Sequence, residues 1–190
     1  MHLPLIQSPL NYTGGKFRLL PQLLEHFPAD LSVFVDLFCG AGNVGANIGA
    51  PHIILNDAQP QLVSLLRMFQ HTNTVDFLTA IDALITCYGF SRTCDFGYGY
   101  YGCNSSQGVA AVNREPYLRL RGDFNGCRDG FLGVDSRDAL TAGFAQPQEY
   151  LLFTLIVFAF NNQIRFNARG EYNLPVGKRD FNGHLQAKVT

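Results

Sequence analysis

The sequence lacks the residue patterns of a metal centre, a disulfide framework and a membrane span. Its five cysteines are an odd number, with no C-x-x-C pair and no histidine at metal-ligand spacing. The longest apolar run, residues 150–160, is too short to cross a bilayer, and no basic segment followed by an apolar one opens the chain. We therefore expect no metal, no disulfides and no membrane association, and a reducing cytoplasm is the simplest location.

Charged residues are also few, 15% of the 190, and the formal net charge is −1. A net charge so close to zero argues against a general nucleic-acid-binding protein. The charge is uneven, however, because residues 1–95 carry four cations and seven acids, whereas residues 96–190 carry ten cations and eight acids. The C-terminal half could thus present a local basic surface to phosphate. The length suits one α/β domain with a sizeable core and a small appendage.

One short stretch, residues 33–42, combines an apolar run with a carboxylate and then glycines. It reads Val-Phe-Val-Asp-Leu-Phe-Cys-Gly-Ala-Gly, which predicts a buried strand, a tight turn and the start of a helix. Gly40 and Gly42 allow backbone angles and a close ligand approach that a side chain would obstruct. With Gly45 they complete a G-x-G-x-x-G, a weak signal alone, which favours a nucleotide-like cofactor.

Two charged residues flank this stretch in the sequence. Asp57 follows the apolar run 53–55, and an acid at the tip of a second strand is the ribose-binding arrangement of nucleotide folds. The alternative role for Asp57 is an N-cap for the helix predicted over residues 61–70. Lys16 follows a Gly-Gly turn at the predicted start of a helix, where the helix dipole disfavours a cation. A bound anion would explain Lys16, and a solvated lysine is the alternative.

The rest of the chain combines predicted core helices with polar segments. Apolar spacing predicts helices within 62–85, a basic amphipathic helix over 117–125 and a buried helix over 148–160, with an irregular aromatic and polar stretch at 88–112. Residues 161–179 alternate apolar with polar around Ala168-Arg169-Gly170, which predicts a β-hairpin with an amide- and arginine-rich face. Such side chains pair with guanine and adenine edges, so the hairpin is a candidate DNA-reading surface. The alternative is a loop organised by its own asparagines.

Five segments carry a resemblance to a known family. They are Tyr12-Thr13-Gly14-Gly15-Lys16, Asp36 to Gly42, Leu55-Asn56-Asp57, Arg119 to Asn125 and Phe160 to Lys178. In this order they resemble the Dam-like, D12 class DNA adenine N6-methyltransferases, and their phage branch in particular. The resemblance implies an α/β fold, namely an incomplete Rossmann-like S-adenosylmethionine-dependent methyltransferase fold with a mostly helical DNA-recognition insertion and a β-hairpin. Residues 1–70 would belong to the catalytic domain, 71–180 to the target-recognition domain with its hairpin at 160–178, and 181–190 to the return to the catalytic domain.

The resemblance also implies roles for single residues. The implied cofactor is S-adenosylmethionine, with Lys16 near its methionine carboxylate and Asp57 at its ribose hydroxyls. The implied cofactor-binding residues are Tyr12, Lys16, Asp36, Phe38, Gly40, Gly42 and Asp57. The implied contacts to double-stranded DNA are Phe160, Asn161, Gln163, Arg165 and Pro175 at the bases and Lys178 at a phosphate. Arg165 is the strongest candidate for sequence specificity.

Two departures from the family pattern affect the expected function. Asn161-Asn162-Gln163 stands where bacterial members commonly carry Asn-Gly-Leu, so a GATC-like target is expected only because it is the family's most common one. The Asp-Pro-Pro-Tyr motif, which orients the target adenine's amino group, does not occur in residues 1–190, so no catalytic residue is assigned. Methyl transfer needs that nitrogen aligned with the donor methyl group. We therefore expect a truncated chain that transfers methyl groups very poorly alone.

The resemblance implies a monomeric, site-specific DNA adenine N6-methyltransferase of the restriction-modification kind, in the cytoplasm of a bacterium or a phage-infected host. One alternative is a non-catalytic DNA-binding remnant that kept the hairpin. Another is an NAD-dependent oxidoreductase built on the glycines and Asp57, which leaves the hairpin and Lys16 unexplained. Because a doubly wound sheet without its last strands would expose apolar surface, we also expect a marginally stable or aggregation-prone chain.

Overall fold

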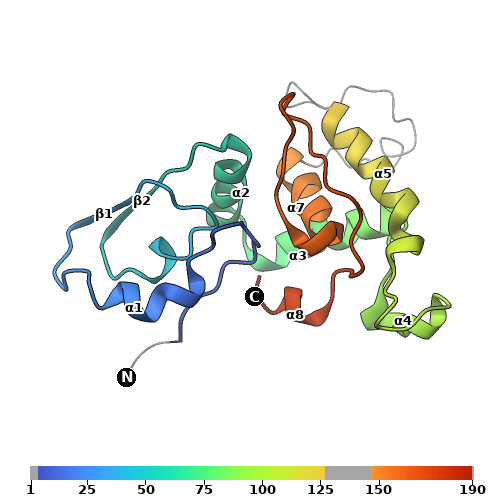
Figure 1. Ribbon diagram of the computed structural model, residues 1–190, viewed down its shortest axis with the longest axis horizontal. Coiled ribbons are helices and arrows are strands. Elements are labelled where there is room, and N and C mark those ends of the chain that lie inside the picture. The colour runs from blue at the N-terminus through green and yellow to red at the C-terminus, as the bar shows by residue number, and fades with distance from the viewer. Residues whose placement is uncertain (1–3, 127–146, 190) are drawn as a thin grey trace. The chain divides into compact units, whose positions relative to one another are not determined.

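A computed structural model describes residues 4–126 and 147–189, which form two compact units, Met1–His71 and Thr72–Lys188 (Figure 1). The first unit is a mixed helix and strand structure. Its elements are the 3₁₀ helix η1 (Phe17–Leu19), α1 (Leu20–Leu24), β1 (Val33–Asp36), the 3₁₀ helix η2 (Gly45–Asn47), β2 (His52–Leu55) and α2 (Pro60–His71). The prediction of an α/β chain is therefore confirmed at the level of a small sheet with helices.

The sheet of the first unit consists of β1 and β2 in parallel, with Val33 opposite His52 and Asp36 opposite Leu55. The ladder continues past both strand ends, because the Asn56 N–H donates to the Asp36 carbonyl and the Cys39 N–H donates to the Asn56 carbonyl, both at 2.9 Å. The two turns that follow the strands therefore lie together at one edge. This edge brings residues 17 positions apart in the sequence into one site.

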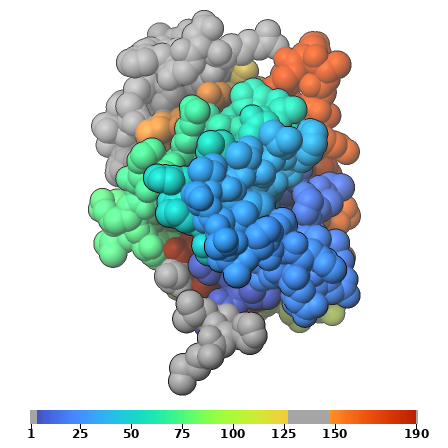
Figure 2. Space-filling model, turned by 90° about the vertical axis from the view of Figure 1, so that its left-hand side faces the viewer, coloured from blue at the N-terminus to red at the C-terminus, as the bar shows by residue number. Residues whose placement is uncertain are grey.

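The first strand was predicted to be buried, and that prediction is wrong. Val33, Val35, Ile53 and Ile54 are between 40% and 53% exposed, and Figure 2 shows the first unit, in blue to cyan, from its β1–β2 end. A parallel sheet is normally covered on both faces, and two strands with few covering helices leave these apolar side chains open to solvent. The expected exposure of apolar sheet surface is therefore observed.

The helix predicted after Gly42 is also absent. The chain passes through Gly40 at φ +52° and Gly42 at φ +75°, and then makes only the short 3₁₀ helix η2. Two positive φ values so close together turn the backbone sharply, which glycine allows and other residues resist. The segment is a glycine turn beside β1, not the start of an α-helix.

The described residues of the second unit, 72–126 and 147–188, are mostly helical. Its elements are α3 (Thr74–Tyr88), α4 (Thr93–Tyr100), α5 (Ala110–Gly126), α7 (Gln148–Phe158), the 3₁₀ helix η3 (Phe160–Asn162) and α8 (Gly183–Gln186). Every residue of α7 from Leu151 to Phe158 is buried, and α7 packs against α3 and α5 (Figure 1). The predicted core helices are confirmed, although α7 ends at Phe158 rather than at residue 160. No helix within the described parts of the chain is long and apolar enough to cross a membrane.

The stretch 88–112 is more ordered than predicted, because it contains α4. The side chain of Asp180, which is buried, accepts from both the N–H and the hydroxyl of Thr93 at 2.7 Å. It also accepts from the Ser91 hydroxyl at 2.9 Å. A carboxylate that satisfies a donor at the first turn of a helix stabilises that helix. The helix is stabilised by a residue 87 positions away, which no local pattern reveals.

Candidate functional site

A cavity of about 360 Å³ opens in the first unit beside the turn after β1. It is lined by Tyr12, Thr13, Gly14, Gly15, Lys16, Phe38, Cys39, Gly40, Ala41, Asn43, Val44 and Asp57. The structure thus brings together Tyr12, Lys16, Phe38, Gly40 and Asp57 among the residues predicted to bind a cofactor. Asp36 and Gly42 do not line the cavity; a Cβ on Gly42 would instead meet a Leu66 methyl group at 3.3 Å.

Asp57 joins the two turns at this edge. Its Oδ2 accepts from the Gly40 N–H at 3.0 Å, and its Oδ1 accepts from the Gln59 N–H at 3.1 Å. Since α2 begins at Pro60, Asp57 does not cap that helix directly, and the N-cap alternative is wrong. Each carboxylate oxygen has two acceptor positions, so each keeps capacity for a ligand hydroxyl.

Tyr12 forms one wall of the cavity, over the glycine turn. A Cβ on Gly40 would lie 3.1 Å from the ring carbon Cδ1 of Tyr12, so glycine is what lets the ring and the backbone approach. The Tyr12 hydroxyl donates to Gln59 Oε1 at 3.4 Å. Burial, and next the negative charge of Asp57, raise the pKa of Tyr12, so the phenol stays neutral.

Asp36 and Lys16 set the charge at the end of β1. Lys16 Nζ donates to the Phe38 carbonyl at 3.2 Å. Burial raises the pKa of Asp36, and the Lys16 charge and a hydrogen bond from the Phe38 backbone lower it by less, while the Asp57 charge adds to the rise. Asp36 Oδ2 is buried without a hydrogen-bond partner among the described residues. A buried carboxylate oxygen in this state favours a ligand that brings a cation or a donor.

Two further wall residues were not identified from the sequence alone. Asn43 is buried, and its Oδ1 accepts from the Ser8 N–H at 2.9 Å, which anchors the N-terminal segment to the glycine turn. Cys39 is also buried, and burial, then the charges of Asp36 and Asp57, raise its pKa to about 11. Both lie inside the 36–43 stretch, so proximity to the glycines was the available signal.

In the second unit, the predicted hairpin is an irregular antiparallel loop, residues 159–177, which we call the 159–177 loop. Isolated bridges join Ala159 with Val176 and Phe166 with Tyr172, and no regular strand lies in this part of the described chain. Asn161 and Asn162 follow one another at φ +55° and +52°, which interrupts an extended strand. The prediction of a regular β-hairpin is therefore wrong, although the antiparallel course is correct.

The backbone of the returning arm is bonded to side chains of α5 as well as to the first arm, where the Asn173 N–H donates to the Arg165 carbonyl at 3.3 Å. Asn125 accepts from the Tyr172 N–H at 2.8 Å and donates to the Tyr172 carbonyl at 3.1 Å. The Leu174 carbonyl accepts from the Tyr117 hydroxyl at 3.0 Å and from Arg121 Nη1 at 3.1 Å. At the tip, Asn167 Oδ1 accepts from the Arg169 and Glu171 N–H groups, as the asparagine-organised alternative predicted.

The residues predicted to contact DNA are distributed along this loop. Phe160 is exposed and lies opposite Pro175, because its N–H donates to the Pro175 carbonyl at 2.9 Å, and Asn161 follows it. Along the first arm, the Gln163 carbonyl accepts from the Tyr172 hydroxyl, and Arg165 donates to Asn173. Lys178 lies just past the loop, where its carbonyl accepts from the Val109 N–H at the start of α5. Five of these residues thus lie on the 159–177 loop and Lys178 directly after it, and neither of the two cavities described in this structure is lined by them.

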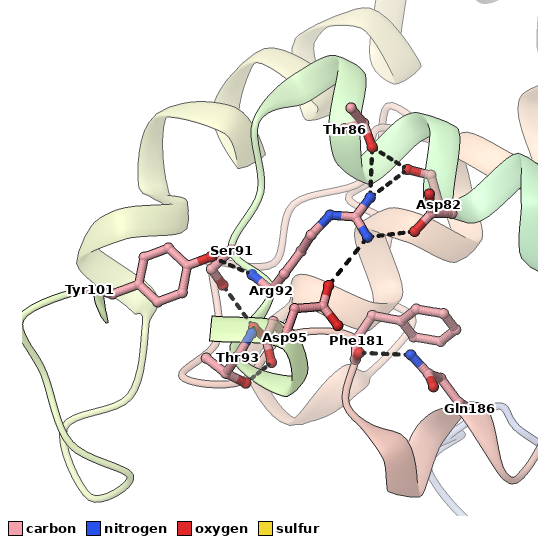
Figure 3. Close-up of polar contacts among 10 residues, drawn as sticks. Asp82, Thr86, Ser91, Arg92, Thr93, Asp95, Tyr101, Phe181 and Gln186 are labelled. Atoms are coloured by element: carbon pink, nitrogen blue, oxygen red, sulfur yellow. Dashed lines mark hydrogen bonds and ion pairs between the residues drawn. The ribbon is translucent and has the colours of Figure 1, made fainter. Parts of the chain in front are cut away.

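A second cavity, of about 410 Å³, lies between α3, α4 and the C-terminal segment of the second unit. Figure 3 shows Arg92 pointing toward α3, where it donates to Asp82 Oδ1 at 2.5 Å and to the Thr86 hydroxyl at 2.6 Å. Asp95 lies 3.7 Å from Arg92 Nη1. Because Arg92 precedes α4 and its guanidinium bonds Asp82 and Thr86 of α3, these contacts hold the start of α4 against α3. Among the described residues, no three potential metal ligands gather into a site.

Comparisons with known proteins agree on one family. The profile of the D12 class N6 adenine-specific DNA methyltransferases matches residues 12–188. The chain is 31% identical over 173 residues to the modification methylase StsI of Streptococcus sanguinis, covering 91% of this chain and 21% of that protein. It is 32% identical over 186 residues to the type II methyltransferase M.FokI of Planomicrobium okeanokoites, covering 97% and 23%.

A third relative is the DNA adenine methylase of Salmonella typhi, which is 28% identical over 170 residues, 89% of this chain and 47% of that protein. The chain therefore spans less than half the length of the curated relatives that it matches. The matched residues 12–188 include the cavity beside β1 and the whole 159–177 loop. On this evidence the chain belongs to the D12 class N6 adenine-specific DNA methyltransferases.

Proposed function

We propose that the protein acts in site-specific methylation of adenine N6 in double-stranded DNA, with S-adenosylmethionine as the methyl donor. The observation that carries the proposal is the cavity of the first unit, where Tyr12, Lys16, Phe38, Gly40 and Asp57 converge within the family match. The relatives are named as a modification methylase, a type II methyltransferase and a DNA adenine methylase. Both the pocket and the relatives' names support the same chemistry.

The donor half of the reaction belongs to the first unit, which we take as an incomplete Rossmann-like methyltransferase fold over residues 1–70. S-adenosylmethionine supplies an electrophilic methyl group on a sulfonium. Asp57 would accept from the ribose hydroxyls, using the acceptor positions that its two backbone bonds leave. Lys16 would face the methionine carboxylate. Asp36 does not line the cavity, but its carboxylate charge, close to Lys16 and Asp57, would favour a donor molecule that is positively charged at its methionine end.

The DNA half belongs to residues 71–180, a mostly helical recognition region, with residues 181–190 returning toward the catalytic domain. Phe160, Asn161, Gln163, Arg165 and Pro175 would contact bases, and Lys178 a phosphate. The exposed positions of Phe160, Asn161, Arg165, Pro175 and Lys178 support this assignment. A GATC-like target, a monomer and a restriction-modification setting in the cytoplasm of a bacterium or phage-infected host complete the proposal.

These 190 residues lack the motif that aligns the target adenine's amino nitrogen with the methyl group of the donor. No Asp-Pro-Pro-Tyr occurs among them, so no side chain named here orients the target amino nitrogen. Misplacement of a reacting group by about 1 Å already costs about 100-fold in rate. We therefore propose that the chain alone binds donor and DNA but transfers methyl groups at least about 100-fold more slowly than a full-length relative.

The test is a transfer assay with methyl-labelled S-adenosylmethionine and adenine-containing duplex DNA, with the Salmonella typhi DNA adenine methylase as the active reference. Any label should appear as N6-methyladenine, at a rate at least about 100-fold below the reference. Label on cytosine would contradict the adenine assignment. Turnover close to that of the reference would contradict the role given to the missing tetrapeptide.

The same absence supports a second candidate, a non-catalytic DNA-binding protein that retains the 159–177 loop. This candidate predicts sequence-selective DNA binding with no label transferred, whether or not S-adenosylmethionine binds. The transfer assay and a DNA-binding measurement on the same preparation separate the two functions.

A further inference from the structure

Three side chains at four-residue intervals on α5 bond the backbone of the 159–177 loop. They are Tyr117, Arg121 and Asn125, which four-residue spacing places along one face of the helix. Asn125 bonds both the N–H and the carbonyl of Tyr172, as a neighbouring strand would. Tyr117 and Arg121 both bond the Leu174 carbonyl. The backbone on either side of one residue, Asn173, is thereby fixed to a helix.

Tyr117 and the loop residues that these side chains hold are buried, whereas Arg121 and Asn125 are partly buried. Tyr117 and Tyr172 are each 1% exposed, and Leu174 is 3% exposed. Phe124 adds an edge-on contact with the Tyr172 ring at 6.3 Å between centroids. Buried donors and acceptors that all have a partner are held rigidly, because any conformation that leaves one of them without a partner costs free energy. The position of Asn173 is therefore set by the core of the second unit, although Asn173 itself is only partly buried.

Asn173 in turn holds the guanidinium of Arg165. Arg165 Nε donates to Asn173 Oδ1 at 2.8 Å, and Arg165 Nη2 donates to the Asn173 carbonyl at 3.1 Å. These two bonds use the side-on edge of the guanidinium, which is the edge formed by the N–H groups of Nε and Nη2. The end-on pair of N–H groups, on Nη1 and Nη2, makes no hydrogen bond to the described residues. Two parallel donors of this kind match the O6 and N7 acceptors of guanine in the major groove.

We propose that Asn173 is a positioning residue, which holds the side-on edge of Arg165 so that its end-on edge reads a guanine in the target site. Tyr117, Arg121 and Asn125 act through Asn173 by fixing its backbone. The inference rests on the proposed function of the loop in DNA recognition, and adds to it a residue that sets the geometry of the Arg165 contact. An arginine held in this way loses less freedom on binding than an unsupported one.

The test is a selection from a random duplex DNA library with the wild-type chain, Arg165→Ala, Asn173→Ala and Asn173→Asp. Wild type should enrich a site that contains an essential guanine. Asn173→Ala should lose at least about fivefold in preference for that guanine and little at other positions, as each good bidentate contact discriminates by about that factor or more. Arg165→Ala should lose preference at the same position, and a double variant with both Arg165→Ala and Asn173→Ala should lose no more than Arg165→Ala. Asn173→Asp, which keeps the acceptor, should restore the preference.

Asn104→Ala serves as the matched control, because Asn104 is an exposed asparagine whose side chain, among the described residues, bonds only the N–H groups of Ser106 and Gln107 in its own turn. A uniform loss of affinity across all positions in Asn173→Ala would indicate a merely structural role and overturn the inference. An unchanged guanine preference in Asn173→Ala would overturn it as well, while leaving the proposed function intact. If the wild-type chain enriches no sequence, the proposed DNA recognition fails and this inference fails with it.

A measurement without DNA tests the positioning role of Asn173 separately from DNA recognition by the loop. Nitrogen-15 relaxation of the Arg165 Nε–H should show an ordered group in wild type and in Asn104→Ala, and a disordered one in Asn173→Ala. Backbone amide spectra of the variants establish that each is folded. An Arg165 Nε–H that is equally mobile in wild type and Asn173→Ala would overturn the positioning role whatever the DNA selection shows.

Discussion

Two carboxylates lie where the strands of the first unit end, Asp36 at the end of β1 and Asp57 two residues past β2, and their surroundings give them different roles. Asp57 accepts backbone N–H groups on both oxygens, which joins the two turns. Asp36 keeps a buried oxygen without a partner, and burial raises its pKa. At the scale of single residues, Asp57 shapes the site, whereas Asp36 supplies a charge that a ligand can compensate.

Asp36 gives the site a pH dependence whose sign follows from its raised pKa. Because the folded pKa exceeds the unfolded one, the contribution of Asp36 to stability is full below the unfolded pKa and is lost as pH rises through the folded pKa. A positively charged donor favours the ionised carboxyl, so S-adenosylmethionine should bind more tightly as the pH rises through that same range. Calorimetric titrations at a series of pH values should show this rise in wild type and not in Asp36→Asn. Identical pH profiles for the two proteins would rule out the charge role of Asp36.

Cys39 provides a second prediction at this scale, because its pKa of about 11 leaves little thiolate near neutral pH. At pH 8 it should react with iodoacetamide at least about 100-fold more slowly than the exposed Cys94, since the thiolate is the nucleophile. Mass spectrometry of peptides from a timed reaction gives both rates in one sample. Equal rates for the two cysteines would show that the wall of the cavity is open to solvent.

Among the elements, the 159–177 loop depends on a close approach between its two ends. The Gly177 N–H donates to the Phe158 carbonyl at 2.7 Å, and a Cβ on Gly177 would overlap the Ala159 carbonyl oxygen. Gly177→Ala should therefore lower the free energy of unfolding by about 1–3 kcal/mol, the usual cost of overpacking. Urea unfolding measures the change. Gly183→Ala, where the added methyl group meets open space, should change it by less than about 0.5 kcal/mol; equal effects would contradict the account.

The elements also show what the sequence can and cannot predict. α3, α5 and α7 were predictable because the apolar spacing that buries a helix lies within the helix itself. α4 and the interrupted strands of the 159–177 loop were not, because their backbone groups are satisfied by Asp180 and Asn125 from distant parts of the chain. Five of the seven cofactor candidates line one cavity because the family motifs that name them lie close in sequence or at strand ends. Asn43 also lines it but belongs to none of those motifs, and its position next to Gly42 was the only signal for it.

For the whole molecule, the open sheet of the first unit predicts modest solution stability. Val33, Val35, Ile53 and Ile54 expose apolar surface that parallel sheets ordinarily bury. The isolated chain should therefore self-associate with rising concentration and unfold over a broad temperature range. Light scattering and a thermal melt measure both properties. A monomer at high concentration with one sharp, cooperative transition would contradict this expectation.

The cavity beside β1 is the proposed donor site of the whole molecule, and a matched pair of exposed side chains tests this assignment. Phe38 is 76% exposed and lines the cavity, whereas its neighbour Leu37 is 59% exposed and does not, so replacing either should leave the fold intact. Isothermal titration with S-adenosylmethionine, and with NAD as the competing cofactor, measures binding directly. We predict one S-adenosylmethionine per wild-type chain, no NAD binding, about tenfold weaker binding in Phe38→Ala and unchanged binding in Leu37→Ala. Binding of NAD in place of S-adenosylmethionine, or equal affinities in the two variants, would contradict the central claim.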